Sequence, residues 1–286
     1  MRPGTAGGSR LQGQGRVLGY GATPSHMRKP PPMSILTRSL TAAALAVLAG
    51  AAQAQNTVVV GLGPQSAPAY FGSDESETGV TGSFEVQELN FGPLRTGGSV
   101  GGTPVGFGFG GSLRYIAERN SSDYAELAGL DDIDATLELG GKISYALPSA
   151  EVFAAVRYGV VGHEALVAEL GGDVIARPTD QITLRVGPRL FFGSDDYADQ
   201  YFGISASEAA ANRAAGGTLV AYDPDGGLLS RGIEASAAYA FNDDWGVKGT
   251  VMVEEYVNDA GDSPIVQQGD DIGTTLSLVV TRRFSF

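Results

Sequence analysis

The sequence predicts an all-β fold, a transmembrane antiparallel up-and-down β-barrel of about 10 strands. From residue 55 onward, apolar and polar residues alternate with the period of a β-strand. The alternating segments run about 10–14 residues, the length of a tilted transmembrane strand, whereas strands of globular proteins are shorter. Their polar faces combine glycine with charges of both signs, as a narrow aqueous lumen requires. An exported β-sandwich, which also alternates, is the alternative; in lipid, however, an open sheet edge would leave amides unpaired, so a membrane sheet must close.

The N-terminal residues predict a secretory signal peptide. Arg28, Lys29 and Arg38 form a positive end, residues 40–52 are a short apolar run, and Ala52-Gln-Ala54 fits the small-x-small cleavage pattern. We therefore expect residues 1–54 to be an N-terminal extension with a cleaved signal peptide. Residues 55–286 are then the outer-membrane β-barrel.

The composition excludes several classes of protein. The chain has no cysteine, so disulfide scaffolds, iron–sulfur clusters and thiol catalysis are excluded. Residues 1–54 contain six Lys/Arg and no acid, so the exported chain keeps 13 bases against 32 acids, a net charge of −19. An exported chain this acidic is unsuited to binding nucleic acid.

Turn residues and alternation together place the strands in order. Tight Pro/Asn/Asp turns at 147–150, 177–180 and 242–244 are expected to face the periplasm, together with both chain ends. The long, mostly acidic segments 71–78, 119–132, 194–228 and 258–271 are expected outside. Segments 91–103 and 216–222 could pair as further strands, so about 12 strands is the alternative. The predicted strands are 57–69, 79–91, 104–118, 133–147, 151–161, 165–177, 181–193, 228–241, 245–257 and 272–286.

Each predicted strand has an apolar face, which we assign to lipid, and a polar face, which we assign to the lumen. Aromatic residues lie towards the strand ends, where interfacial girdles are expected: Tyr115, Tyr145, Tyr158, Phe192, Tyr239, Phe241, Trp245, Phe284 and Phe286. Because a barrel of this size has a narrow lumen, we favour a network of charges across the lumen over a selective pore. The inward charged residues are Glu85, Arg114, Glu118, Asp134, Glu138, Lys142, Arg157, Glu169, Asp173, Arg177, Arg185, Arg189, Glu234, Lys248, Glu254 and Arg283.

Candidates for chemistry are few. His163, beside Glu164, is the one histidine after residue 54; it lies in a short Gly-flanked turn without a G-x-S-x-G motif, and we interpret it as a solvated loop residue. Two acidic groups could supply oxygen ligands to Ca²⁺, but neither follows the twelve-residue loop with its closing Glu, and we interpret them as solvated turns. These groups are Asp195, Asp196 and Asp199, and Asp223 with Asp225. We assign no catalytic, cofactor-binding or metal-binding residue.

Four motifs follow one another along the exported chain. They are Ala67-Pro-Ala-Tyr-Phe-Gly-Ser-Asp74, Arg119-Asn-Ser-Ser-Asp123 followed by Leu127, Gly129-Leu130 and Asp132-Ile133, Tyr201-Phe-Gly-Ile-Ser205 with Glu208-Ala209, and Asn258-Asp-Ala-Gly-Asp-Ser-Pro-Ile-Val266. Together these motifs resemble the MipA/OmpV family of outer-membrane proteins across the whole exported chain. The ending Arg283-Phe-Ser-Phe286 also matches the C-terminal aromatic signature of barrel proteins, whereas segment 216–222 departs from the family pattern.

The resemblance implies a scaffold without catalytic residues or cofactors. The family's namesake is described as an adaptor between a lytic transglycosylase and a bifunctional peptidoglycan synthase, and other members are associated with adhesion or stress response. We therefore expect a non-enzymatic barrel of the Gram-negative outer membrane that contacts lipid and lipopolysaccharide and scaffolds peptidoglycan-remodelling enzymes. The alternatives are a small outer-membrane pore and an adhesion or stress-response barrel. An enzyme that cleaves lipid or peptide is the least supported function.

Overall fold

The computed structural model describes residues 57–88, 90–91, 94–95, 98–100 and 103–285. The predicted signal peptide and the terminal Phe286 lie outside these residues. Within the described ranges, no helix is long and apolar enough to cross a membrane.

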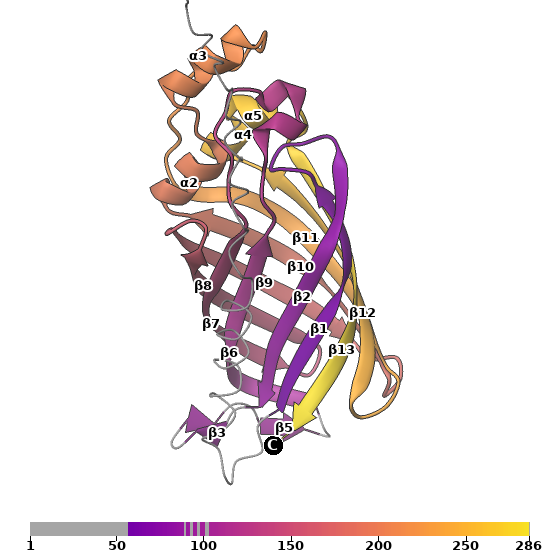
Figure 1. The fold of residues 1–286 in the computed structure, drawn as a ribbon. Helices are drawn as coiled ribbons and strands as arrows, with labels where there is room; N and C mark the ends of the chain where they lie inside the picture. Colours follow the sequence, from indigo (N-terminus) through magenta and orange to yellow (C-terminus); the bar gives the residue numbers. More distant parts are fainter. Residues whose placement is uncertain (1–56, 89, 92–93, 96–97, 101–102, 286) are drawn as a thin grey trace, which may run out of the picture. The chain divides into compact units, whose positions relative to one another are not determined.

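Ten long antiparallel strands form the wall of the barrel, which confirms the predicted fold class (Figure 1). Each strand begins within three residues of its predicted start, because the alternation and the turn residues both mark the boundaries. The long strands are β1 (Thr57–Pro68), β2 (Ser76–Glu88), β6 (Thr103–Ile116), β7 (Thr136–Leu147), β8 (Ala150–Val161), β9 (Leu166–Ala176), β10 (Ile182–Gly193), β11 (Gly227–Ala240), β12 (Trp245–Tyr256) and β13 (Ile272–Ser285).

The two segments that could have raised the count to twelve do not add long strands. Segment 91–103 contains parts of three short strands, and segment 216–222 takes part only in an isolated bridge between Ile204 and Tyr222. The short strands are β3 (Asn90–Phe91), β4 (Leu94–Arg95) and β5 (Gly98–Val100).

The first and last described strands, β1 and β13, pair with each other. Antiparallel ladders join β2-β1-β13-β12-β11-β10-β9-β8-β7-β6 in that order. Between β2 and β6 the described residues form no ladder. The two strands are nevertheless close, because the Phe84 ring of β2 would lie 3.2 Å from a Cβ added to Gly111 of β6. At the lower end of β6 in Figure 1, β5 pairs with it and occupies the edge that β2 would otherwise extend along.

Side-chain exposure confirms the predicted inside and outside faces. Leu139 and Ile143 of β7 are exposed on the outer face, whereas Glu138 of the same strand is buried. Leu276 and Leu278 of β13 are exposed in the same way. The girdle residues within the described range are also exposed, except Phe192, which is half-buried; the exposed ones are Tyr115, Tyr145, Tyr158, Tyr239, Phe241, Trp245 and Phe284.

Short turns lie at one end of the wall, together with the connection between β2 and β6 that contains β3, β4 and β5, and long loops lie at the other end. The β11–β12 turn is closed by the Asn242 carboxamide oxygen, which accepts hydrogen bonds from the backbone N–H groups of Asp244 (3.0 Å) and Trp245 (2.9 Å). The loops at the opposite end fold into short helices, which lie at the top in Figure 1. These are η1 (Ser121–Asp123), η2 (Ala125–Leu127), α2 (Asp195–Phe202), α3 (Ala206–Ala214), α4 (Asn258–Gly261) and α5 (Pro264–Gln267).

Candidate functional site: a charged wall beneath a loop cap

The lumen face of β6–β11 carries a chain of ion pairs, which we call the charged wall. Arg157 of β8 lies at its centre. Its Nε is 2.9 Å from Glu138 of β7, and its guanidinium is 3.0 Å from Glu169 of β9. The chain continues through Arg189 of β10, which is 2.9 Å from Asp173. The other members are Arg114, Lys142, Glu151, Arg185 and Glu234.

A second centre of the charged wall lies nearer the short turns. Glu151 accepts hydrogen bonds from Lys142 (3.1 Å) and Arg185 (3.2 Å). The Phe153 ring lies between two cations, 4.3 Å from the Lys142 ammonium and 5.1 Å from the Arg189 guanidinium carbon. Each contact stabilises a cation that the partly exposed lumen hydrates incompletely.

The arrangement of the charged residues corrects the predicted network. The ion pairs connect side chains on neighbouring or next-neighbouring strands of one wall, not side chains across the lumen, because ladder partners already hold their Cα atoms close together. Glu118, Asp134 and Arg177, which were expected to point inward, lie outside the strands and are exposed. Glu85, Lys248, Glu254 and Arg283 lie on the strands but outside the charged wall.

Glu151 is the member of the charged wall that the sequence analysis missed. It opens β8 and shares the inward phase of Phe153, Ala155 and Arg157. That phase was the available signal, since residues two apart on a strand share a face.

His163 is buried, and its interpretation as a solvated loop residue is wrong. Its Nε2 lies 3.3 Å from the Glu138 carboxylate, and its Nδ1 accepts a hydrogen bond from the Ala165 amide. The rings of Tyr197 and Tyr201 pack edge-on against the imidazole. Gly159 makes room for this turn, because a Cβ there would collide with His163. Long-range packing of this kind leaves no trace in the local sequence.

The long loops form a folded cap at one end of the barrel; we call segments 69–75, 117–135, 194–226 and 257–271 the loop cap. Both hydrophobic clusters of buried residues among the described residues include it. One cluster joins the loop cap to the inner wall, through Tyr197, Phe202 and Val266 on the cap side and Val167 and Leu229 on the wall side. The other is built from the loops alone: Tyr70, Leu127, Leu130, Ile204, Ala209, Leu219 and Ile265.

Buried polar groups connect the loops to one another. The Asn212 carboxamide of α3 donates hydrogen bonds to the backbone oxygens of Glu126 (3.0 Å) and Ala128 (2.9 Å), and accepts one from the Leu219 amide. The Tyr70 hydroxyl donates to Glu126 at 2.8 Å. Burial and this carboxylate together raise the pKa of Tyr70, so the phenol keeps its proton.

Aspartates of the acidic turns link the loops to one another. The Asp195 carboxylate accepts a hydrogen bond from the Gly226 amide, and the Asp259 carboxylate accepts one from the Asp225 amide. Asp196, Asp199 and Asp223 are exposed. Across the described part of the chain, no group of three or more His, Asp or Glu residues is placed to hold a metal ion.

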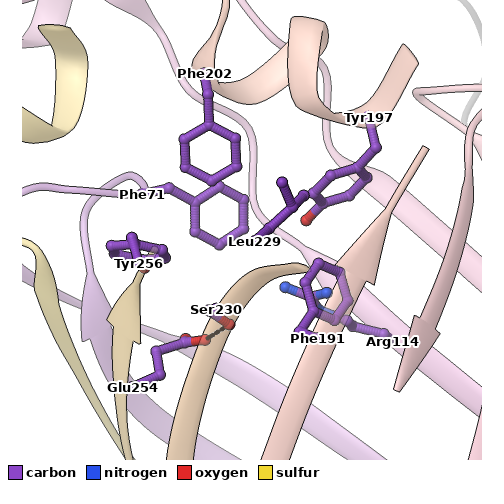
Figure 2. A pocket seen from close by; sticks show the side chains of 9 residues that line it. All are labelled: Phe71, Arg114, Phe191, Tyr197, Phe202, Leu229, Ser230, Glu254 and Tyr256. Carbon is purple, nitrogen blue, oxygen red and sulfur yellow. Dashed lines mark hydrogen bonds between the residues drawn. The ribbon is translucent and has the colours of Figure 1, made fainter. Parts of the chain in front are cut away.

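The charged wall and the loop cap meet at a small cavity (Figure 2). The Arg114 guanidinium carbon lies 4.5 Å from the centre of the Phe191 ring and 5.8 Å from that of Phe71. On the other side, Ser230 donates a 2.7 Å hydrogen bond to Glu254, drawn as a dashed line in Figure 2. The remaining lining residues are Tyr197, Phe202, Leu229 and Tyr256.

Apolar strand faces outside, a charged lumen inside and long loops at one end define a class of protein, the outer-membrane β-barrel. The chain belongs to the MipA family, since the family described as MltA-interacting protein MipA matches residues 60–284. A search of curated proteins found no match.

Solved outer-membrane barrels are distantly similar to this chain. An outer membrane channel from Pseudomonas putida is 10% identical, with a TM-score of 0.41, and the match covers 82% of this chain and 97% of that one. The outer membrane protein OprG from Pseudomonas aeruginosa is 10% identical, with a TM-score of 0.24 and coverage of 80% and 96%. The channel DcaP of Acinetobacter baumannii is 8% identical, with a TM-score of 0.27 and coverage of 82% and 99%.

Proposed function

We propose that this protein is a non-enzymatic scaffold that holds peptidoglycan-remodelling enzymes, a lytic transglycosylase and a peptidoglycan synthase, at the periplasmic rim of a capped barrel. The family description names an interaction with such an enzyme. The loop cap is the observation that carries the proposal. A barrel filled at its outer end has little use as a pore, and at its other end the short turns are exposed.

The packing of the loop cap supports a non-conducting barrel. Tyr197, Ala198 and Phe202 of α2 are at most 2% exposed, although they belong to a loop. They pack against Leu229 of β11 and Val167 of β9, so side chains from separate strands meet over the lumen. A hydrated ion that passed this point would have to displace these apolar contacts and lose water. Removing an ion from water into a protein interior costs several kcal/mol, and on the order of 20 kcal/mol at the upper limit.

The contacts of His163 support a role without catalysis. A general base needs a free nitrogen that faces a nucleophile. Here one imidazole nitrogen faces Glu138 and the other accepts a hydrogen bond from the backbone.

On the outer side, the acidic loops lie against lipopolysaccharide, and divalent cations are shared between the two surfaces.

Site-directed cross-linking tests the scaffold role. Because the natural chain has no cysteine, single cysteines can carry a photo-reactive group at Ser149 and Asp243 in the short turns, and at Ala215 in the loop cap as a control; all three positions are exposed. We expect adducts with a lytic transglycosylase from both turn positions in living cells. Equal labelling from Ala215, or none from either turn, would contradict the proposal, as would steady ion-selective conductance of the purified protein.

A further inference from the structure

Arg114 connects parts of the molecule that no strand ladder joins. It lies on β6, whereas Phe191 lies on β10 and Phe71 on the loop between β1 and β2. Its side chain therefore reaches across the lumen from β6 to β10 and to the loop cap, at the cavity shown in Figure 2. A guanidinium over aromatic faces is attracted by the ring quadrupoles, more strongly where water is excluded.

The ionic contact of Arg114 is weak in comparison. Its guanidinium is 3.9 Å from Glu138, the same carboxylate that Arg157 approaches to 2.9 Å and His163 to 3.3 Å. Glu138 is thus satisfied by two closer partners, and the aromatic rings are what fix the Arg114 side chain. If Arg114 served only to neutralise Glu138, its guanidinium would not need to lie over Phe191 across the lumen.

Phe71 is the loop-cap residue through which this contact spreads. Its ring packs against Tyr201, Phe202 and Tyr256, at centroid distances between 5.1 and 6.0 Å. The next residue, Gly72, has a φ of +91° and fits against α5 because it lacks a Cβ. Phe71 therefore cannot move without disturbing α2 and α5 of the loop cap and the end of β12.

Hydrogen bonding at the same junction is incomplete. The Tyr197 hydroxyl, which lines the cavity, is buried and has no hydrogen-bond partner among the described residues. The Arg114 side chain lines the same cavity.

We propose that Arg114 is the gate residue of the barrel: its guanidinium, held over Phe191 and Phe71, closes the junction between the lumen and the loop cap, and its removal opens the lumen to small ions. This inference rests on the closed, non-conducting barrel of the proposed function, but not on the binding of enzymes at the periplasmic rim.

Planar-bilayer recordings of matched variants test the gate. Arg114→Ala is expected to give steady conductance steps that the natural protein lacks. Arg185→Ala is the control, because Arg185 is also an inward arginine with a 27% exposed side chain, but it contacts Glu151 and Asp173 on the wall. It should stay closed. Arg114→Lys, whose ammonium can sit over one ring but lacks the planar fork, should open less than Arg114→Ala.

Chemical rescue separates a gate from a general loss of lumen charge. Added guanidinium should occupy the vacated position over Phe191 and reduce the Arg114→Ala conductance in a concentration-dependent manner, whereas sodium at the same concentration should not. Closure of Arg114→Ala to the level of the natural protein, equal opening of Arg185→Ala, or a conductance that guanidinium leaves unchanged would each overturn the proposal.

Phe71→Leu removes the aromatic ring beneath the Arg114 guanidinium from the loop-cap side and leaves every lumen charge in place. It should open the barrel in the same direction, and combining it with Arg114→Ala should add little. Insertion is checked first by heat-modifiable migration of the folded barrel, and if Arg114→Ala fails to insert, Phe71→Leu decides: a closed Phe71→Leu barrel overturns the gate. If the natural protein conducts, the capped scaffold is contradicted. The gate is then tested by the ratio of the Arg114→Ala conductance to that of the natural protein, and a ratio of one overturns it.

Discussion

The interior of the charged wall and the interior of the loop cap are built from different side chains. On the wall, Arg157 and Glu138 are buried as an ion pair between ladder-paired strands. In the loop cap, the buried residues are mainly aromatic and aliphatic, such as Phe202 and Ile265. Strand hydrogen bonds fix the wall backbone, so its interior can be given to charges that satisfy one another. The loops lack that support, and hydrophobic packing must hold them together.

The largest expected effect is on the charged wall. Glu138→Ala would leave Arg157 and His163 without their shared carboxylate in a fully buried position, and removing one partner of a buried ion pair typically costs about 3–5 kcal/mol. Urea unfolding in lipid vesicles measures the loss. Glu234→Ala is the control, because Glu234 is partly exposed whereas Glu138 is buried; in both variants the arginine keeps a second carboxylate, Asp173 for Arg189 and Glu169 for Arg157. If both variants lose equally, burial is not what makes the Glu138 pair matter.

Two adjacent positions on β7 test the faces of the wall. Ile143 is exposed on the lipid side and Ser144 is half-buried on the lumen side, near Glu151 on the paired strand. Arginine at the bilayer midplane costs about 2–4 kcal/mol on the lipid face, so Ile143→Arg should lose that much stability. Ser144→Arg should lose far less, because the lumen is wet and Glu151 can receive the new charge. The reverse order in vesicle unfolding would place the strand one residue out of register.

The close packing of the loop cap can be separated from backbone strain with two glycines. Gly72 and Gly216 both have positive φ, +91° and +95°, and alanine in this conformation costs about 1–3 kcal/mol. A Cβ on Gly72 would lie 2.6 Å from the Val266 Cα, whereas nothing lies within 4 Å of one on Gly216. Gly72→Ala should therefore lower the unfolding midpoint more than Gly216→Ala. Equal shifts would mean that the loop cap relaxes around Gly72 at no cost.

The smallest expected effect is the response of the loop cap to acid. Burial alone would raise the pKa of Glu208, but hydrogen bonds from the amides of Asp131 and Ser205 and from the Ser205 hydroxyl outweigh it and lower the pKa below 4.5. A carboxyl with a depressed folded pKa stabilises the folded state above its unfolded pKa, and this contribution is lost as the pH falls through the folded pKa. Protease cleavage within α3 should thus increase below about pH 4.5, the unfolded value. The neutral variant Glu208→Gln should be cleaved more readily at pH 7 and show less change with pH; an unchanged pH profile would exclude Glu208 as its source.

The sequence by itself determined that there are about ten long strands, where each begins to within three residues, and which face the side chains within a strand occupy. Apolar residues such as Leu139 and Ile143 alternate with polar ones at a period of two, which is a local property of the strand. The same alternation is needed in any sheet that separates lipid from water. Turn residues such as Asn242 act on their own backbone, so they too can be recognised without the fold. The family resemblance was visible for the same reason, because its motifs follow the order of the strands and loops.

Only the tertiary structure decided which inward residues are buried and with what partner. Thr136 and Ser144 have the same phase on β7, yet Thr136 lies fully buried beneath α2, where it accepts a hydrogen bond from Tyr201, while Ser144 stays half-buried. His163 and Arg114 likewise owe their surroundings to residues far away in the sequence. Depth below a folded cap depends on contacts between loops from different hairpins, and those contacts arise from side-chain shape and volume, which carry no periodic signal along the chain.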